Sequence, residues 1–115
     1  MPPSLGDRLE HILECINSIR LMIASDSIDA IAGNRAKRLA LEREFEIICE
    51  ASRYVPGEIK ATEPGIDWHR MVDLGNRLRH AYHRIQIEIL VQIAQADLPQ
   101  LKDFIERVLA QEAKR

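Results

Sequence analysis

The chain has 115 residues, which suits a single helical domain over residues 1–115 with one hydrophobic core. Apolar residues make up 46% of it and charged residues 30%, the balance expected of a soluble globular protein. The formal net charge of −2 argues against a protein that coats nucleic acid with its whole surface, and it leaves room for a local basic patch.

The N-terminal segment and the two cysteines bear on where the protein works. No apolar run approaches the roughly 20 residues of a membrane span. The opening MPPSLGDRLEH lacks the apolar stretch of a signal peptide. We therefore expect a cytoplasmic protein with no membrane partner. Cys15 and Cys49 lack metal-ligand spacing, and we interpret both as buried thiols on helix faces.

The first predicted helix begins after Ser4 and runs to about residue 24. Asp7 stands three residues after Ser4, which is the spacing of a capping box. Apolar residues then recur at steps of three and four and define one face of the helix. They are Leu5, Leu9, Ile12, Ile16, Ile19 and Ile23.

A break at residues 25–27 and a short turn up to Gly33 precede a second long helix over residues 34–54. Pro56 and Gly57 are expected to end this helix. Its predicted core positions are Leu41, Phe45, Ile48, Cys49 and Ser52.

A connection over residues 58–65 leads to a third helix. Asp67 is its predicted N-cap and Trp68 its first residue. A bend is expected near residues 83–86. The apolar stripe of this helix consists of Met71, Leu74, Leu78, Ala81 and Ile85.

Two further helices complete the chain. Residues 87–95 are too apolar for a surface helix, and they suit either the core or a contact with a second copy. Asp97 is the predicted cap of the last helix, with Pro99 in its first turn and Gln100 closing a capping box. The inner face of that helix consists of Leu98, Leu101, Ile105, Val108 and Leu109. We predict an all-α, up-and-down bundle of four or five helices.

The stretch GNRLRHAYHR, residues 75–84, carries three arginines and two histidines with no acidic residue. At about 100° per residue, a continuous helix separates this segment into two faces. The apolar arc consists of Leu74, Leu78, Ala81, Tyr82 and Ile85. The opposite arc consists of Asn76, Arg77, Arg79, His80, His83 and Arg84.

The opposite arc is suited to phosphodiester chemistry. Histidine exchanges a proton near neutral pH, and guanidinium groups bind phosphate and stabilise the charge that develops during its transfer. RNA cleavage needs no metal, since its own 2′-hydroxyl is the nucleophile. His80 and His83 lack an evident third ligand for a metal. The alternative interpretation is an inert, solvated helix face.

The sequence resembles the HepT-like family of bacterial toxin–antitoxin systems, part of the HEPN superfamily. Four segments carry the similarity: DRLEHILECI, FEIICEAS, IDWHRMVDLGNRLRHAY and ADLPQLKDFI. The resemblance implies a helical homodimer in which the motif helices of two protomers line a shared cleft. It also implies a metal-independent endoribonuclease that requires no cofactor.

The family motif is an arginine, a polar residue, three residues, a histidine, one residue and a tyrosine. Asn76, His80 and Tyr82 match it, and Gly75 occupies the arginine position. Either Arg79 or Arg77 takes over the arginine's role, or the protein binds RNA and cleaves it poorly, or it serves another purpose. A looser register pairs Arg77 with His83, and we favour the His80 register because it alone places Tyr82.

The family's partner is a minimal nucleotidyltransferase antitoxin that transfers AMP to the motif tyrosine, here Tyr82. The added charge and bulk would keep RNA phosphates out of a basic cleft. We assign proton transfer to His80, positioning to Asn76, and phosphate binding to Arg79 first, with Arg77, His83 and Arg84. One rival interpretation is a catalytically weak or inactive binding module that binds RNA or regulates a partner nucleotidyltransferase. The other is a plain structural dimer.

Two residues outside the motif have alternative interpretations. Glu50, where the family favours a glutamate, either pairs with an arginine of the motif helix or is an exposed helix charge. Trp68 anchors the start of its helix in the core or in a dimer interface.

Overall fold

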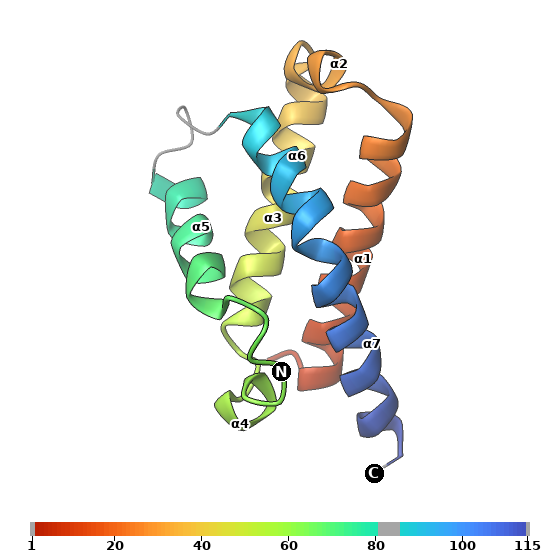
Figure 1. The fold of residues 1–115 in the computed structure, drawn as a ribbon, viewed down its shortest axis with the longest axis vertical. Coiled ribbons are helices and arrows are strands. Elements are labelled where there is room, and N and C mark those ends of the chain that lie inside the picture. Colours follow the sequence, from red (N-terminus) through yellow and green to blue (C-terminus); the bar gives the residue numbers. More distant parts are fainter. Residues whose placement is uncertain (1, 81–85, 115) are drawn as a thin grey trace.

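The computed structural model describes residues 2–80 and 86–114 (Figure 1). Within these ranges every regular element is a helix, which confirms the predicted all-α fold. In chain order the helices are α1 (Leu5–Ser25), α2 (Ile28–Ala32), α3 (Arg35–Ser52), α4 (Gly57–Lys60), α5 (Trp68–His80), α6 (Ile87–Ala96) and α7 (Leu98–Ala113). None of these helices has the length and apolar character needed to span a membrane.

The long helices pack side by side around α3. Helix α1 lies between α3 and α7, and α5 lies along the opposite side of α3 (Figure 1). Helices α6 and α7 follow one another along one line, with α6 reaching α2 at the end of the bundle. Helix α5 therefore stands at the edge of the bundle, and its own charged face is open to solvent.

Aliphatic side chains fill the core, as the shortage of aromatic residues requires. Full burial of each large apolar side chain stabilises the fold by roughly 1.5–3 kcal/mol. All five predicted core positions of the second long helix are buried. Ile31 and Phe104 are also buried, although the helical patterns did not select them. The largest fully buried side chains are Phe45, Phe104, Leu9, Ile12, Ile16, Ile19, Ile31, Leu41, Ile48, Leu90 and Ile105.

Side chains cap the starts of α1, α2, α3 and α5, whereas α4, α6 and α7 begin without a side-chain capping bond. The predicted box of α1 is present, since Ser4 Oγ accepts the Asp7 amide at 3.1 Å and the Asp7 carboxylate accepts the Ser4 amide at 3.0 Å. Asp67 caps α5 by accepting the Arg70 amide at 3.0 Å. The predicted capping box of α7 was wrong. The Asp97 side chain makes no capping bond, because Asp97 itself has helical backbone angles, and its carboxylate lies 3.6 Å from the Arg70 guanidinium.

Two expected connections contain short helices. The predicted turn before Gly33 is α2, which Ser27 caps through the Ala30 amide at 3.1 Å. The predicted connection over residues 58–65 includes most of α4, which begins after Pro56. Helix α3 ends at Ser52, before the predicted end at residue 54. Pro56 thus precedes α4 and does not itself terminate α3.

Candidate functional site

The position of α5 on α3 depends on a close contact at Gly75. Gly75 and Leu78 are the buried residues of α5. A Cβ atom built on Gly75 would lie 2.9 Å from the Cβ of Cys49 on α3. Because that neighbouring atom belongs to a buried helix, any larger residue would push the two helices apart. The position at which the resemblance leads us to expect an arginine is therefore a packing position in this chain.

The outward side of α5 carries the polar residues that the helical wheel places there. Asn76, Arg77 and His80 are exposed. Neither the Arg77 side chain nor the His80 side chain has a hydrogen-bond or ion-pair partner among residues 2–80 and 86–114. Both side chains are therefore exposed and unpaired within that part of the chain.

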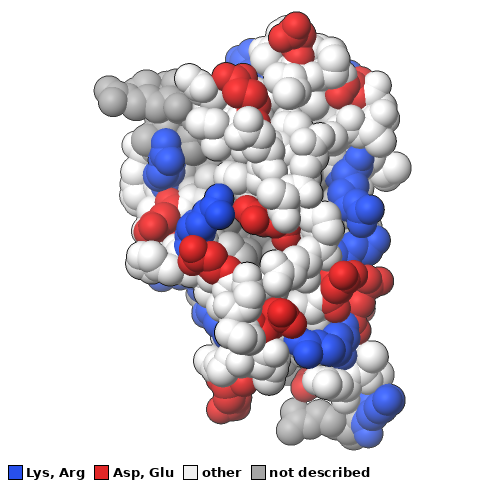
Figure 2. Space-filling view, viewed as in Figure 1, with Lys and Arg blue, Asp and Glu red and all other residues white. Residues whose placement is uncertain are grey.

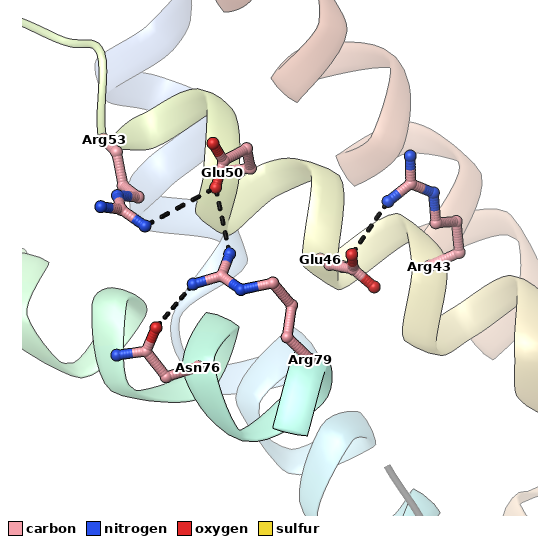
Figure 3. A network of polar contacts seen from close by, with 6 residues as sticks. All are labelled: Arg43, Glu46, Glu50, Arg53, Asn76 and Arg79. Atoms are coloured by element: carbon pink, nitrogen blue, oxygen red, sulfur yellow. Dashed lines mark hydrogen bonds and ion pairs between the residues drawn. The ribbon is translucent and has the colours of Figure 1, made fainter. Parts of the chain in front are cut away.

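Arg79 lies differently from its neighbours, because it reaches back across the helix interface to α3 (Figure 3). Its Nη1 donates to Glu50 Oε2 at 3.1 Å, and its Nη2 donates to Asn76 Oδ1 at 2.6 Å. The Arg79 side chain is only 29% exposed. The wheel predicted a solvent-facing Arg79, whereas the Glu50 carboxylate draws the guanidinium into a half-buried position.

Glu50 is the acceptor that organises this cluster. Its Oε2 also lies 3.8 Å from Nη1 of Arg53, so one carboxylate faces two guanidinium groups. Of the two interpretations of Glu50, the structure supports the ion pair with the motif helix. The pair fixes the orientation of Arg79 and, through it, the amide of Asn76. A guanidinium has five N–H donors, so Arg79 keeps donors for a phosphate while bound to both partners.

The remaining predicted site residues, Tyr82, His83 and Arg84, lie outside the described residues. The expected bend near residues 83–86 falls largely there too. The structure thus brings Asn76, Arg79 and Glu50 together and places His80 one turn beyond Asn76 on the same helix.

The buried thiols beside the site are unsuited to nucleophilic chemistry. Burial raises the pKa of Cys49 to about 12, against a smaller opposing effect of the Arg79 charge. Burial likewise raises the pKa of Cys15 to about 12. Both are free, buried cysteines, as predicted. In the part of the chain that the structure describes, no three His, Cys, Asp or Glu side chains converge as a metal site would require.

Comparison with known proteins bears directly on this site. The family described as "Ribonuclease HepT-like" matches residues 12–108, a span that includes α3, α5 and the whole motif. The chain is 31% identical over 108 residues to "Probable ribonuclease HepT" of Thermococcus cleftensis, covering 94% of this chain and 98% of that protein. It is 34% identical over 100 residues to "Putative RNase MJ1380" of Methanocaldococcus jannaschii, covering 87% and 92%.

A more distant relative, named "Putative RNase TTE0752", comes from Caldanaerobacter subterraneus. It is 23% identical over 104 residues, covering 90% of this chain and 93% of that protein. No solved structure matches the chain at a significant level. The extent of the family match shows that the chain belongs to the HepT-like family, whose description and relatives are those of ribonucleases.

Proposed function

We propose that this chain is a metal-independent endoribonuclease and the toxin of a bacterial toxin–antitoxin pair. The observation that carries the proposal is the exposed end of α5, where Asn76, Arg77 and His80 stand beside an oriented Arg79 in a HepT-like chain. We further propose that residues 1–115 form one cytoplasmic domain that works as a homodimer, with two motif helices lining a shared cleft.

The proposed reaction uses the RNA's own nucleophile. The ribose 2′-oxygen attacks the adjacent phosphorus, and the bond from phosphorus to the 5′-oxygen breaks. The proton of the 2′-hydroxyl leaves and a proton reaches the 5′-oxygen, and His80 is the group that exchanges these protons. Arg79 stabilises the charge on the phosphorus oxygens, with Arg77, His83 and Arg84 as further phosphate ligands. Asn76, whose Oδ1 accepts a hydrogen bond from Arg79, positions the histidine or the substrate.

Replacement of His80 tests this assignment. The purified chain is expected to cleave RNA without added metal, and His80→Ala should lower the rate roughly 10²- to 10⁴-fold, the usual contribution of a positioned acid or base. His69→Ala is the matched control, because His69 is an 85% exposed histidine on the same helix that faces Asp73. Equal cleavage by the His80→Ala variant and the unchanged chain would refute the assignment.

A second proposal concerns the partner. We propose that a minimal nucleotidyltransferase antitoxin silences the enzyme by modifying Tyr82. The tyrosine oxygen would attack the α-phosphorus of ATP, pyrophosphate would leave, and the phenolic proton would pass to solvent. The support for this step is the motif match, which places the tyrosine two residues after His80.

Peptide mass spectrometry after incubation with the transferase and ATP tests the modification. The expected result is one added AMP on the peptide that holds Tyr82 and none when that residue is phenylalanine. The tyrosine at position 54, also present in the chain, is the internal control. An unmodified Tyr82 in the presence of an active transferase would contradict the proposal.

One observation favours a catalytically weak binding module as the alternative. Gly75 fills the arginine position of the motif and its contact with Cys49 leaves no space for a side chain. Paired measurements on one RNA separate the two functions. Tight, salt-dependent binding without cleavage products would indicate the binding module, since salt dependence reports contacts with phosphates.

A further inference from the structure

A cavity of about 140 Å³ lies between α3, α5 and the α6–α7 pair, beside the motif helix. The side chains at its walls are mainly apolar and include Phe45, Ile48, Met71, Leu74, Ile93 and Leu101. Its volume is close to that of an engineered apolar cavity of about 150 Å³ that accepts benzene. The cavity therefore has space for one flat, six-membered ring or for much of a bicyclic one.

The rim of this cavity, in contrast to its walls, is polar. It contains Asp67, Arg70, Asp97 and Gln100. Figure 2 shows a hollow in the middle of this face, with acidic and basic side chains gathered at its edge. The Arg70 guanidinium and the Asp97 carboxylate face each other at 3.6 Å and are 63% and 48% exposed, so little energy is needed to rearrange them. The rim thus offers hydrogen-bond donors and acceptors together.

The cavity adjoins a wider groove that follows α5 toward the motif. This groove has a volume of about 480 Å³ and shares Arg70, Leu74, Ile93 and Asp97 with the cavity. It extends along α5 to Arg77, whose side chain is exposed and unpaired within the described part of the chain. At 1.5 Å per residue, Met71 in the cavity wall lies roughly 13 Å along the helix from His80.

We propose that this cavity binds one nucleobase of the RNA substrate, away from the scissile phosphate. The apolar walls contact the faces of the base, and the rim residues pair with its hydrogen-bonding edge. The backbone follows the groove past Arg77 to His80. An aliphatic side chain from a protein partner could not hydrogen-bond with the rim residues, whereas the polar edge of a base could, which favours a base. This inference rests on the proposed ribonuclease function for the identity of its ligand.

Nucleoside binding tests the cavity without reference to cleavage. The chain contains three methionines, and Met71 lines the cavity whereas Met22 lies on α1. With methyl-labelled methionine in the His80→Ala chain, at least one of the four ribonucleosides at millimolar concentration should shift the Met71 signal and leave Met22 unchanged. Ribose 5-phosphate, which lacks a base, should shift neither signal.

Two outcomes would overturn the proposal. One is the absence of any Met71 shift with all four nucleosides. The other is a Met71 shift with N-acetyltyrosinamide alone, which would identify the cavity as a receptor for a protein side chain.

Filling the cavity provides a second measurement. Ile93→Trp replaces an aliphatic side chain of the cavity wall with an indole ring that fills the cavity. This change should weaken nucleoside binding at least about tenfold. The matched control is Ile89→Trp, one turn earlier on α6, where the residue is 39% exposed and lines only the wider groove. Ile93→Phe replaces Ile93→Trp if the larger residue unfolds the chain. Nucleoside affinity that is unchanged in the filled variants would contradict the proposal.

Failure of this inference is distinguishable from failure of the proposed function. If the chain binds nucleosides but cleaves no RNA, the cavity is a base-binding site and the proposed ribonuclease function is wrong. If the chain cleaves RNA in a reaction that depends on His80 but binds no nucleoside, the ribonuclease function stands and the proposed base-binding site is wrong.

Discussion

Gly75 occupies a position of the family motif and also forms the close packing contact between α5 and α3. The family resemblance places an arginine there, while the structure places the backbone of α5 against the side chain of Cys49. A helix interior disfavours glycine by about 1 kcal/mol relative to alanine, so its presence requires a compensating reason. The close approach of α5 to α3 supplies that reason. The proposed function therefore assigns phosphate binding to other side chains of the motif segment, with Arg79 first.

Gly75→Ala is expected to destabilise the fold despite its better helix propensity. Overpacking a well-filled site typically costs 1–3 kcal/mol, against a propensity gain of about 1 kcal/mol, so the net loss should reach about 1 kcal/mol. Urea unfolding measures the change. Gly6→Ala is the control, because its Cβ would meet only Ser4 Oγ at an ordinary 3.7 Å.

Cys49→Ala should not rescue the Gly75→Ala variant, because the obstructing atom is the Cβ of Cys49, which alanine retains. Rescue by that second change, or a Gly75→Ala chain more stable than the original, would show that the close contact is absent.

At this same scale, the helical wheel predicted the exposure of Asn76, Arg77 and His80, because the repeat of one helix determines which way they point. It did not predict the half-buried position of Arg79. That position depends on Glu50, which lies 29 residues earlier on another helix.

At the scale of the element, helix starts are the best-predicted features. Ser4 caps α1 and Asp67 caps α5 as predicted. Asn34, predicted as the first residue of its helix, caps α3 by accepting the Lys37 amide at 3.1 Å. Each cap is a hydrogen bond between a side chain and an amide three residues later, so a few neighbouring residues are enough to predict it. Asp97 is a predicted cap that makes no such bond, because its own backbone angles are helical; its carboxylate instead faces Arg70 of a different helix.

The box at α1 makes a prediction about pH. Hydrogen bonds from the Ser4 amide and hydroxyl lower the pKa of Asp7 below its usual value of 3.8. A carboxyl group with a lowered pKa in the folded state contributes stability above its unfolded pKa, and this contribution is lost as pH falls through the folded value. The melting temperature of Asp7→Asn should therefore lie below that of the unchanged chain at neutral pH, and the two should converge in acid.

Ser4→Ala is the companion variant and should cost about 1 kcal/mol at neutral pH, the typical loss for an N-cap. An Asp7→Asn deficit that stays constant from neutral pH into acid would contradict a role for the charged carboxylate.

The two short helices, unlike the capped helix starts, could not be predicted from local sequence. Helix α2 has five residues and α4 has four, too few for helices that are stable alone. Burial of Ile31 in the core ties α2 to the bundle. Local pattern could not reveal these helices, since their stability comes from contacts with the rest of the chain.

At the scale of the whole molecule, one aliphatic core includes side chains from both halves of the chain. Trp68 at the start of α5 contacts Phe104 of α7 edge-on, with ring centroids 5.2 Å apart. Of the two predicted anchor positions for Trp68, this contact supports the core, and it links the motif helix to α7. The two cysteines are buried in the same interior.

Thiol labelling should therefore report opening of the fold. With pKa values raised to about 12, both cysteines are neutral thiols at pH 8 and are shielded from reagent. A thiol-reactive aromatic disulfide should label both cysteines slowly in native buffer. In denaturant it should label both quickly. Single Cys15→Ser and Cys49→Ser variants identify each signal. Rapid labelling of either thiol in native buffer would show a more open interior than this structure has.

The sequence by itself determined the all-α class, the long helices, the caps of α1 and α5, and the exposure of Asn76, Arg77 and His80. These features depend on residues within about four positions of one another, and their spacing is legible along the chain. Only the tertiary structure decided the close contact of Gly75 with Cys49, the ion pair between Glu50 and Arg79, and the cavity between α5 and its neighbours. Each of these joins distant segments, and their distances are settled only when the core packs.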